Sequence, residues 1–168
     1  EEDHPDLPAG LNGLPVVACS LHSQVAVVAA VARHLRPGTR VAYVMTDGAA
    51  LPLALSDLVA ELVARGVLAT TVTAGHALGG ELEAVSVPSA LALARHAAGA
   101  DLTVVGMGPG VVGTASPLGT TAVEVAGIVD AATAMGGRVA LCCRASSADA
   151  RPRHRGVSHH VRTILDLA

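Results

Sequence analysis

Arginines and histidines gather near the C-terminus in a pattern that could bind an anion. In the segment from Arg151 to His160, RPRHRGVSHH, three arginines precede a glycine, a serine and two adjacent histidines at the expected start of a helix. Arginine side chains and the positive end of a helix both favour an anionic ligand. We expect this positive charge to lower the pKa of His159 and His160 and so to keep both imidazoles neutral. The alternative is a C-terminal arm that docks on the sheet or on another subunit.

Other polar side chains follow the predicted strands and include histidines and acids. Imidazoles and carboxylates serve as acids, bases and ligands of zinc or another divalent metal. We predict catalytic roles for His22, Asp47, His76, Glu81 and His159. The candidate ligands of a divalent metal, the one cofactor that the sequence suggests, are His76, His154, His159 and His160. The chain has no HExxH or CxxC spacing, so the ligands would come from different loops, and purely structural roles stay open.

A glycine-rich loop follows the apolar run Leu102 to Val105 and contains G-x-G-x-x-G. Pro109 interrupts the motif, and the next helix is expected only at Thr120 or Thr121, which disfavours a dinucleotide site. Backbone N–H groups and hydroxyls beside a helix start still suit a phosphate or carboxylate. The predicted anion-binding residues are Gly108, Gly110, Gly113, Thr114, Thr120, Arg153 and Arg155. A structural turn or a subunit contact is the alternative.

Apolar runs alternate with segments of helical periodicity along the chain. The expected strands are 15–21, 40–45, 68–73, 101–106 and 139–143, and the expected helices end near residues 35, 65, 98, 135 and 167. Residues 74–87 are expected to form a long loop. Alternating strands and helices predict an α/β three-layer sandwich, Rossmann-like or flavodoxin-like, with a five-stranded, mainly parallel sheet and helices on both faces. All candidate residues would then meet at the carboxyl edge of the sheet, where such folds bind ligands.

The composition limits the class of protein. Hydrophobic residues make up 51% of the 168 residues, with no Phe, Trp or Lys, and the net charge is −3. We therefore expect a core of small side chains, a homo-oligomer, and no nucleic-acid or membrane partner. The three cysteines fall in expected strands and predict reduced core residues of a cytoplasmic protein. Residues 1–14 are expected to be a linker-like arm, followed by a single α/β domain at 15–168.

Several long motifs resemble one family. They are CSLHSQ from Cys19, AYVMTDGAALPLALS from Ala42, TAGHALGGELEAV from Thr73, VVGMGPGVVGT from Val104, and RPRHRGVSHH. These are similar to an uncharacterised bacterial family known as domain of unknown function 3866. The resemblance implies that this chain is the C-terminal portion of a longer protein. It implies no activity and no site residues.

Two functions are therefore expected from the sequence. The first is an enzyme or binding domain for a small anionic molecule at the carboxyl edge, with metal-assisted hydrolysis or group transfer as its preferred chemistry. The alternative is an oligomeric scaffold or regulatory module without catalysis.

Overall fold

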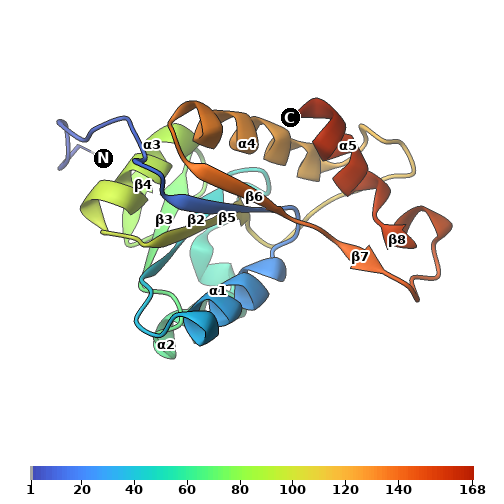
Figure 1. Cartoon of the computed structure of the whole chain (residues 1–168), viewed down its shortest axis with the longest axis horizontal. Coiled ribbons are helices and arrows are strands. Elements are labelled where there is room, and N and C mark those ends of the chain that lie inside the picture. The colour runs from blue at the N-terminus through green and yellow to red at the C-terminus, as the bar shows by residue number, and fades with distance from the viewer. Residues whose placement is uncertain (1) are drawn as a thin grey trace.

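A parallel sheet with helices on both faces forms the centre of the molecule (Figure 1). The computed structural model describes residues 2–168, and within them the main sheet has six strands in the order β4-β3-β2-β5-β1-β6. The strands are β1 (Pro15–Cys19), β2 (Val41–Thr46), β3 (Thr70–Ala74), β4 (Leu82–Ala84), β5 (Leu102–Met107) and β6 (Arg138–Cys142). Every pair of neighbours is parallel. All residues of β2 and β3 are buried, as expected for strands covered on both faces.

The predicted three-layer α/β sandwich is confirmed. Helices α1 (Gln24–Leu35) and α2 (Asp57–Ala64) cover one face of the sheet, and α3 (Val87–Ala92), α4 (Glu124–Ala134) and α5 (His159–Leu167) cover the other (Figure 1). Small side chains such as Ala29 of α1 and Ala132 of α4 are completely buried. Helices with such side chains can approach the sheet closely, as expected from a chain without Phe or Trp.

The predicted number of strands was wrong by one. Strand β4 lies inside the segment that was expected to be a long loop, and it pairs with β3 through Val72 and Leu82. It has three residues, with Glu83 in the middle. So short a strand with a charged centre has no readable periodicity, and it forms because the neighbouring strand offers free backbone groups.

The strand order places β5 between β1 and β2, whereas the first two strands are neighbours in both the Rossmann and the flavodoxin orders. From β1 the chain passes through α1 to β2, toward the β4 edge of the sheet. From β5 it passes through α4, which lies on the opposite face from α1, to β6 at the other edge. The connections therefore reverse direction between β5 and β1, and the loops that leave these two strands separate there. Such a reversal at the carboxyl edge is where open α/β sheets bind ligands.

The segment after β6 is more ordered than predicted. Strands β7 (Ala145–Ser146) and β8 (Gly156–Val157) pair antiparallel, and a 3₁₀ turn, Pro152–His154, lies between them. This hairpin extends beyond the carboxyl end of β6 and leads directly into α5 (Figure 1). Cys143, predicted to be buried, is exposed just beyond β6.

The N-terminal segment is partly built into the domain. Leu11 and Leu14 are buried in the core on the α3 and α4 side, and the Leu11 backbone N–H donates to the Met135 carbonyl. The end of the predicted arm therefore packs on the domain, while Glu1 lies outside the described residues. Within residues 2–168, no helix combines the length and apolar character that a bilayer crossing requires.

Candidate functional site

A cavity of about 190 Å³ opens at the carboxyl edge, beside the reversal point between β5 and β1. Ser20 and Leu21 reach it from the end of β1, and Val111 and Gly113 reach it from the loop after β5. The rest of its wall comes from Ala122, in the 3₁₀ turn before α4, and from the segment after β6. That part includes Arg144, Arg151, Arg153, His154, Ser158 and His160.

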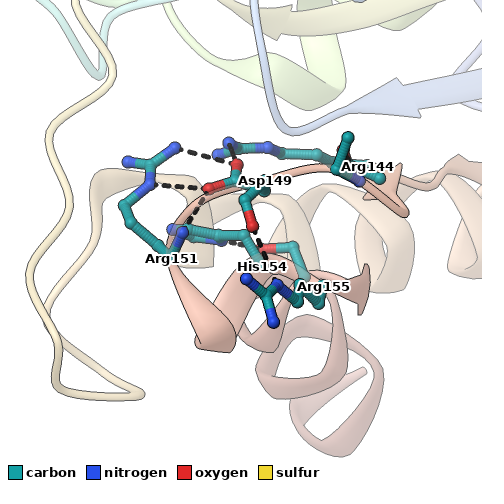
Figure 2. A network of polar contacts seen from close by, with 8 residues as sticks. Arg144, Asp149, Arg151, His154 and Arg155 are labelled. Atoms are coloured by element: carbon teal, nitrogen blue, oxygen red, sulfur yellow. Dashed lines mark hydrogen bonds and ion pairs between the residues drawn. The ribbon is translucent and has the colours of Figure 1, made fainter.

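Two of these arginines are held in place by one carboxylate. Asp149 accepts hydrogen bonds from Arg144 Nη2 at 3.0 Å and from Arg151 Nε at 3.0 Å and Nη2 at 3.1 Å (Figure 2). Arg155 Nε donates to the Asp149 backbone carbonyl at 3.1 Å. The hydrogen bonds from Arg151 hold the pKa of Asp149 well below its usual range, so it stays ionised. Asp149 thereby fixes the positions of two guanidinium groups but does not itself line the cavity.

Arg153 lines the cavity without a partner. Among the described residues it forms no ion pair, and its side chain is exposed. Its charge is therefore available to a ligand. Arg155, which was also predicted to bind an anion, lies outside the cavity lining, because its guanidinium points to the Asp149 carbonyl.

Three histidines of the tail pack against one another. The ring centroids of His159 and His160 are 4.0 Å apart, and the His154 ring lies 5.1 Å from His159 and 5.3 Å from His160. His154 Nδ1 is 2.8 Å from the buried Ser158 hydroxyl. The Nε2 atoms of His159 and His160 are both buried and have no hydrogen-bond partner among the described residues.

The surroundings of all three imidazoles lower their pKa values. Burial, followed by the charges of Arg144 and Arg151, lowers the pKa of His154 to about 4. Burial also lowers the pKa of His159 and His160, and Arg144 and Arg153 act in the same direction. The predicted direction is thus confirmed, with burial as the larger cause.

His22, predicted to be catalytic, belongs to a closed hydrogen-bond network on the α2 side of the sheet. Its Nε2 is 2.7 Å from Ser56 Oγ, and its Nδ1 is 3.2 Å from Tyr43 Oη. The Tyr43 hydroxyl donates to the carbonyls of Gly106 and Met107, so Nδ1 carries the proton and donates to Tyr43. Ser56 then donates to Nε2 while its oxygen caps α2 through the Val59 N–H. Each group has a partner, which is typical of a structural network.

Asp47 and His76 lie together at the edge but away from the tail histidines. Asp47 Oδ2 accepts a 3.2 Å hydrogen bond from the His76 backbone N–H, and the His76 side chain is exposed. His76 follows β3, which is four strand spacings from β6, or roughly 19 Å. His76 does not line the cavity that holds His154 and His160, so the structure does not bring the four predicted metal ligands together. Within residues 2–168, no three His, Cys, Asp or Glu side chains are arranged to hold a metal ion.

Glu81 does not reach the carboxyl edge. Its carboxylate accepts a 2.7 Å hydrogen bond from Thr70 Oγ1, and its backbone N–H donates to Thr71 Oγ1. Both threonines are at the start of β3. The prediction failed because β4 runs parallel to β3, so the chain must return to the amino end of β3 before β4 begins.

Most of the glycine-rich loop uses its polar groups internally. Thr114 Oγ1 donates to the Gly119 carbonyl at 3.0 Å, and Thr120 Oγ1 donates to the Val112 carbonyl at 2.9 Å. Gly108 packs against Met45, and Gly110 has a φ of 115°, which only glycine adopts readily. Of the predicted anion-binding residues in this loop, Gly113 alone lines the cavity. A Cβ atom on Gly113 would lie 2.6 Å from His160 Cε1, so this glycine makes room for the imidazole.

Three residues at this edge were not among the predicted site residues. Arg151 was named only as part of the segment RPRHRGVSHH, and Arg144 was not assigned to a site, although both line the cavity. Glu124 was missed completely. It accepts a 2.7 Å hydrogen bond from Thr46 Oγ1, and burial, with the nearby Asp47 as a further cause, raises its pKa. No sequence signal distinguishes Glu124, because one acid in the first turn of a helix is ordinary.

A family model covers nearly the whole chain, from residue 3 to residue 168, and is described as Protein of unknown function (DUF3866). The chain belongs to this family. The resemblance of its five motifs is thereby confirmed. No curated protein and no solved structure matches the chain.

Proposed function

We propose that the protein binds a small oxyanion in the cavity at the carboxyl edge. The observation that carries this proposal is the charge of the lining: it contains three arginines and, among the described residues, no Asp or Glu. Arg153 is without an ionic partner, and guanidinium groups bind phosphate, sulfate and carboxylate through paired N–H donors.

The size of the cavity limits the ligand. Pockets for drug-sized molecules measure about 300–1,000 Å³, and this cavity measures about 190 Å³. It therefore suits an inorganic oxyanion or the anionic end of a longer molecule. Its place at the reversal between β5 and β1 is also the usual ligand position of open α/β sheets.

An enzyme and a binding domain for a small anion would both have to bind that anion first, so anion binding is the step to test. Calorimetric titration with sodium sulfate and with sodium phosphate is expected to give binding at low ionic strength. An Arg153→Ala substitution should weaken that binding about ten- to hundredfold, because a charge-assisted hydrogen bond contributes roughly 1.5–3 kcal/mol.

Arg162→Ala is the matched control. Arg162 is an exposed arginine of α5 outside the cavity lining, so its removal changes the net charge equally but should leave the affinity unchanged. Equal losses in the two variants would mean that the anion responds only to overall charge. Absence of binding to the unmodified protein would refute the proposed function.

Assembly with a second copy of the chain is a second candidate function, favoured by the outer face of α1. Val27, Val31 and Leu35 of this helix are 61%, 49% and 76% exposed, and they form one ridge at a spacing of four residues. Exposed apolar side chains that lie side by side often mark a surface that a partner covers. The ridge bears no charge that would select a charged partner, and its regular spacing allows it to pack against its own copy.

Light scattering coupled to size exclusion tests this assembly. The unmodified chain should form a dimer, and Val31→Glu should convert it to a monomer, because the interface would bury an unpaired charge. Leu165→Glu, at an exposed position of α5, is the control that should leave the dimer intact. A monomeric unmodified chain across a concentration series would rule out this candidate.

A further inference from the structure

A carboxylate outside the cavity lining joins two of the three arginines that line it. Oδ2 of Asp149 accepts hydrogen bonds from Arg144 Nη2 at 3.0 Å and from Arg151 Nη2 at 3.1 Å (Figure 2). Because both nitrogens are bound to the same oxygen, they lie no more than about 6 Å apart. Like charges at this separation repel each other unless a negative charge lies between them. Asp149 therefore keeps together two arginines that would otherwise separate.

Asp149 is itself fixed in position. Its Oδ1 accepts hydrogen bonds from the backbone N–H and from the Nε of Arg151, both at 3.0 Å. Arg155 Nε donates to its backbone carbonyl at 3.1 Å, and only 13% of the Asp149 side chain is exposed. The carboxylate thus binds the Arg151 side chain through Nε and Nη2 together, and this paired arrangement fixes the plane of the guanidinium.

Both arginines keep donors that Asp149 does not use. Arg144 Nε and Nη1 and Arg151 Nη1 have no hydrogen-bond partner within residues 2–168. The two arginines line the cavity, whereas Asp149 does not. A guanidinium has five N–H donors, so an oxyanion in the cavity can accept hydrogen bonds from the remaining ones without displacing Asp149.

Asp149 has two opposite effects on an anion in the cavity. Its charge repels the anion, but this charge is compensated by two guanidinium groups in direct contact. Its hydrogen bonds hold two long side chains that are otherwise partly exposed on a hairpin with only two residues in each strand. A side chain that is already ordered loses less conformational entropy when a ligand binds it. We expect this ordering to outweigh the repulsion.

We infer that Asp149 is a positioning residue of the anion site, and that its carboxylate makes the cavity bind an anion more tightly. It acts through Arg144 and Arg151, which it holds side by side, and it does not touch the ligand. The inference rests on the proposed function. It is the opposite of what charge alone predicts, because the removal of an acid near a cavity favours an anion.

Asp149→Asn tests the inference by the sign of its effect. Sodium sulfate is titrated calorimetrically into the unmodified protein and into the variant at low ionic strength. The variant should bind sulfate about tenfold more weakly, although its net charge is more positive, because sulfate must then immobilise the freed arginines. Asp166→Asn, at an exposed acid of α5 outside the cavity lining, removes the same charge and should not weaken binding.

A second background separates positioning from a general loss of structure. In a protein that carries Arg151→Ala, Asp149 has only Arg144 left to hold, so Asp149→Asn should lower the affinity by a smaller factor. Should Asp149→Asn fail to fold, ¹⁵Nε relaxation of the arginines in the unmodified protein replaces it. The Nε–H groups of Arg144 and Arg151 should be nearly as ordered without sulfate as with it, and ordering that appears only with sulfate would contradict the inference.

The possible results separate the two proposals. If sulfate does not bind the unmodified protein, the proposed function and this inference fall together. If Asp149→Asn binds sulfate as tightly as the unmodified protein or more tightly, the function stands and the inference is wrong. If the loss is as large in the Arg151→Ala background, Asp149 does not act through the pair of arginines and its positioning role is overturned.

Discussion

Two histidine regions at the carboxyl edge of one sheet differ in whether their ring nitrogens have hydrogen-bond partners. His22 follows β1, and its two ring nitrogens form hydrogen bonds with Tyr43 and Ser56. His160 begins α5, beside the cavity, and its Nε2 is buried with no partner among the described residues. Burial lowers the pKa of both imidazoles, so perturbed titration does not distinguish them.

The comparison shows that a polar side chain at the ligand edge is no sign of a site until its hydrogen bonds have been counted. His22 has chemically suitable neighbours, a hydroxyl at each nitrogen. Those hydroxyls are themselves engaged, because Ser56 caps α2 and Tyr43 donates to backbone carbonyls. His160 Nε2 has no such partner among the described residues, and three arginines line the same cavity as His160. The hydrogen bonds of the first region are complete, whereas the second region keeps a ring nitrogen without a partner among the described residues.

The largest expected effect is on stability and comes from the His22 region. His22→Ala should lower the free energy of unfolding by about 3 kcal/mol, because it leaves the Ser56 and Tyr43 hydroxyls without their partner and opens a cavity. Urea titration measures this loss, and sulfate affinity should be unchanged. His34→Ala, on the exposed face of α1, should change the stability little. A stable His22→Ala protein that no longer binds sulfate would reverse the roles of the two regions.

The next effect is a loss of stability in acid that involves the tail histidines. The surroundings lower the pKa of His154 to about 4 in the folded protein, from the ordinary value of 6.5 that it has in the unfolded chain. Between these values the unfolded chain binds more protons, so stability is complete above pH 6.5 and falls as the pH is lowered toward 4. We expect a loss on the order of 2 kcal/mol across this window, measured by urea unfolding.

His154→Asn isolates this contribution, because His22, His159 and His160 titrate in the same direction. The amide can keep a hydrogen bond to Ser158 but does not titrate. The variant should show a shallower pH dependence over the same window. An identical pH dependence would mean that His154 is not held neutral by its surroundings.

The smallest effect comes from the glycine that borders His160. Gly113→Ala should weaken sulfate binding about tenfold, or roughly 1.4 kcal/mol, because the new methyl group displaces the imidazole from the cavity wall. Calorimetry at neutral pH measures the change. Gly127→Ala in α4, where a Cβ would meet nothing within 4 Å, should leave the affinity unaltered and stabilise the helix slightly. Unchanged affinity in Gly113→Ala would place the ligand away from His160.

Much of the fold could be predicted because its signals are local. Runs such as VAYVMT in β2 are mostly apolar, as expected of strands covered on both faces, and glycines follow several helices. Strand β4 could not be predicted, because three residues with a central glutamate carry no periodicity. Its effect extended to the site: without β4, Glu81 was assigned to the wrong end of β3.

The candidate site was predicted in part. RPRHRGVSHH identified Arg153, His154 and His160 by residue type, and all three line the cavity. The same reasoning added His76, which is separated from them by the width of the intervening strands, a distance that depends on strand order. It also added Thr114 and Thr120, whose hydroxyls are engaged within their own loop.

The sequence by itself determined the layered α/β architecture and the chemical character of the tail, because both follow from residue type and short-range spacing. The tertiary structure alone decided which loops meet. It placed β5 between β1 and β2 and so brought the loops after β1 and β5 to the arginines after β6. The same strand order left His76 outside the cavity lining. The tertiary structure also decided which polar atoms are left without partners, because hydrogen bonding at the edge joins residues as far apart in the sequence as Thr46 and Glu124. The lack of a hydrogen-bond partner at His160 Nε2 among the described residues follows from that arrangement, and no sequence motif indicates it.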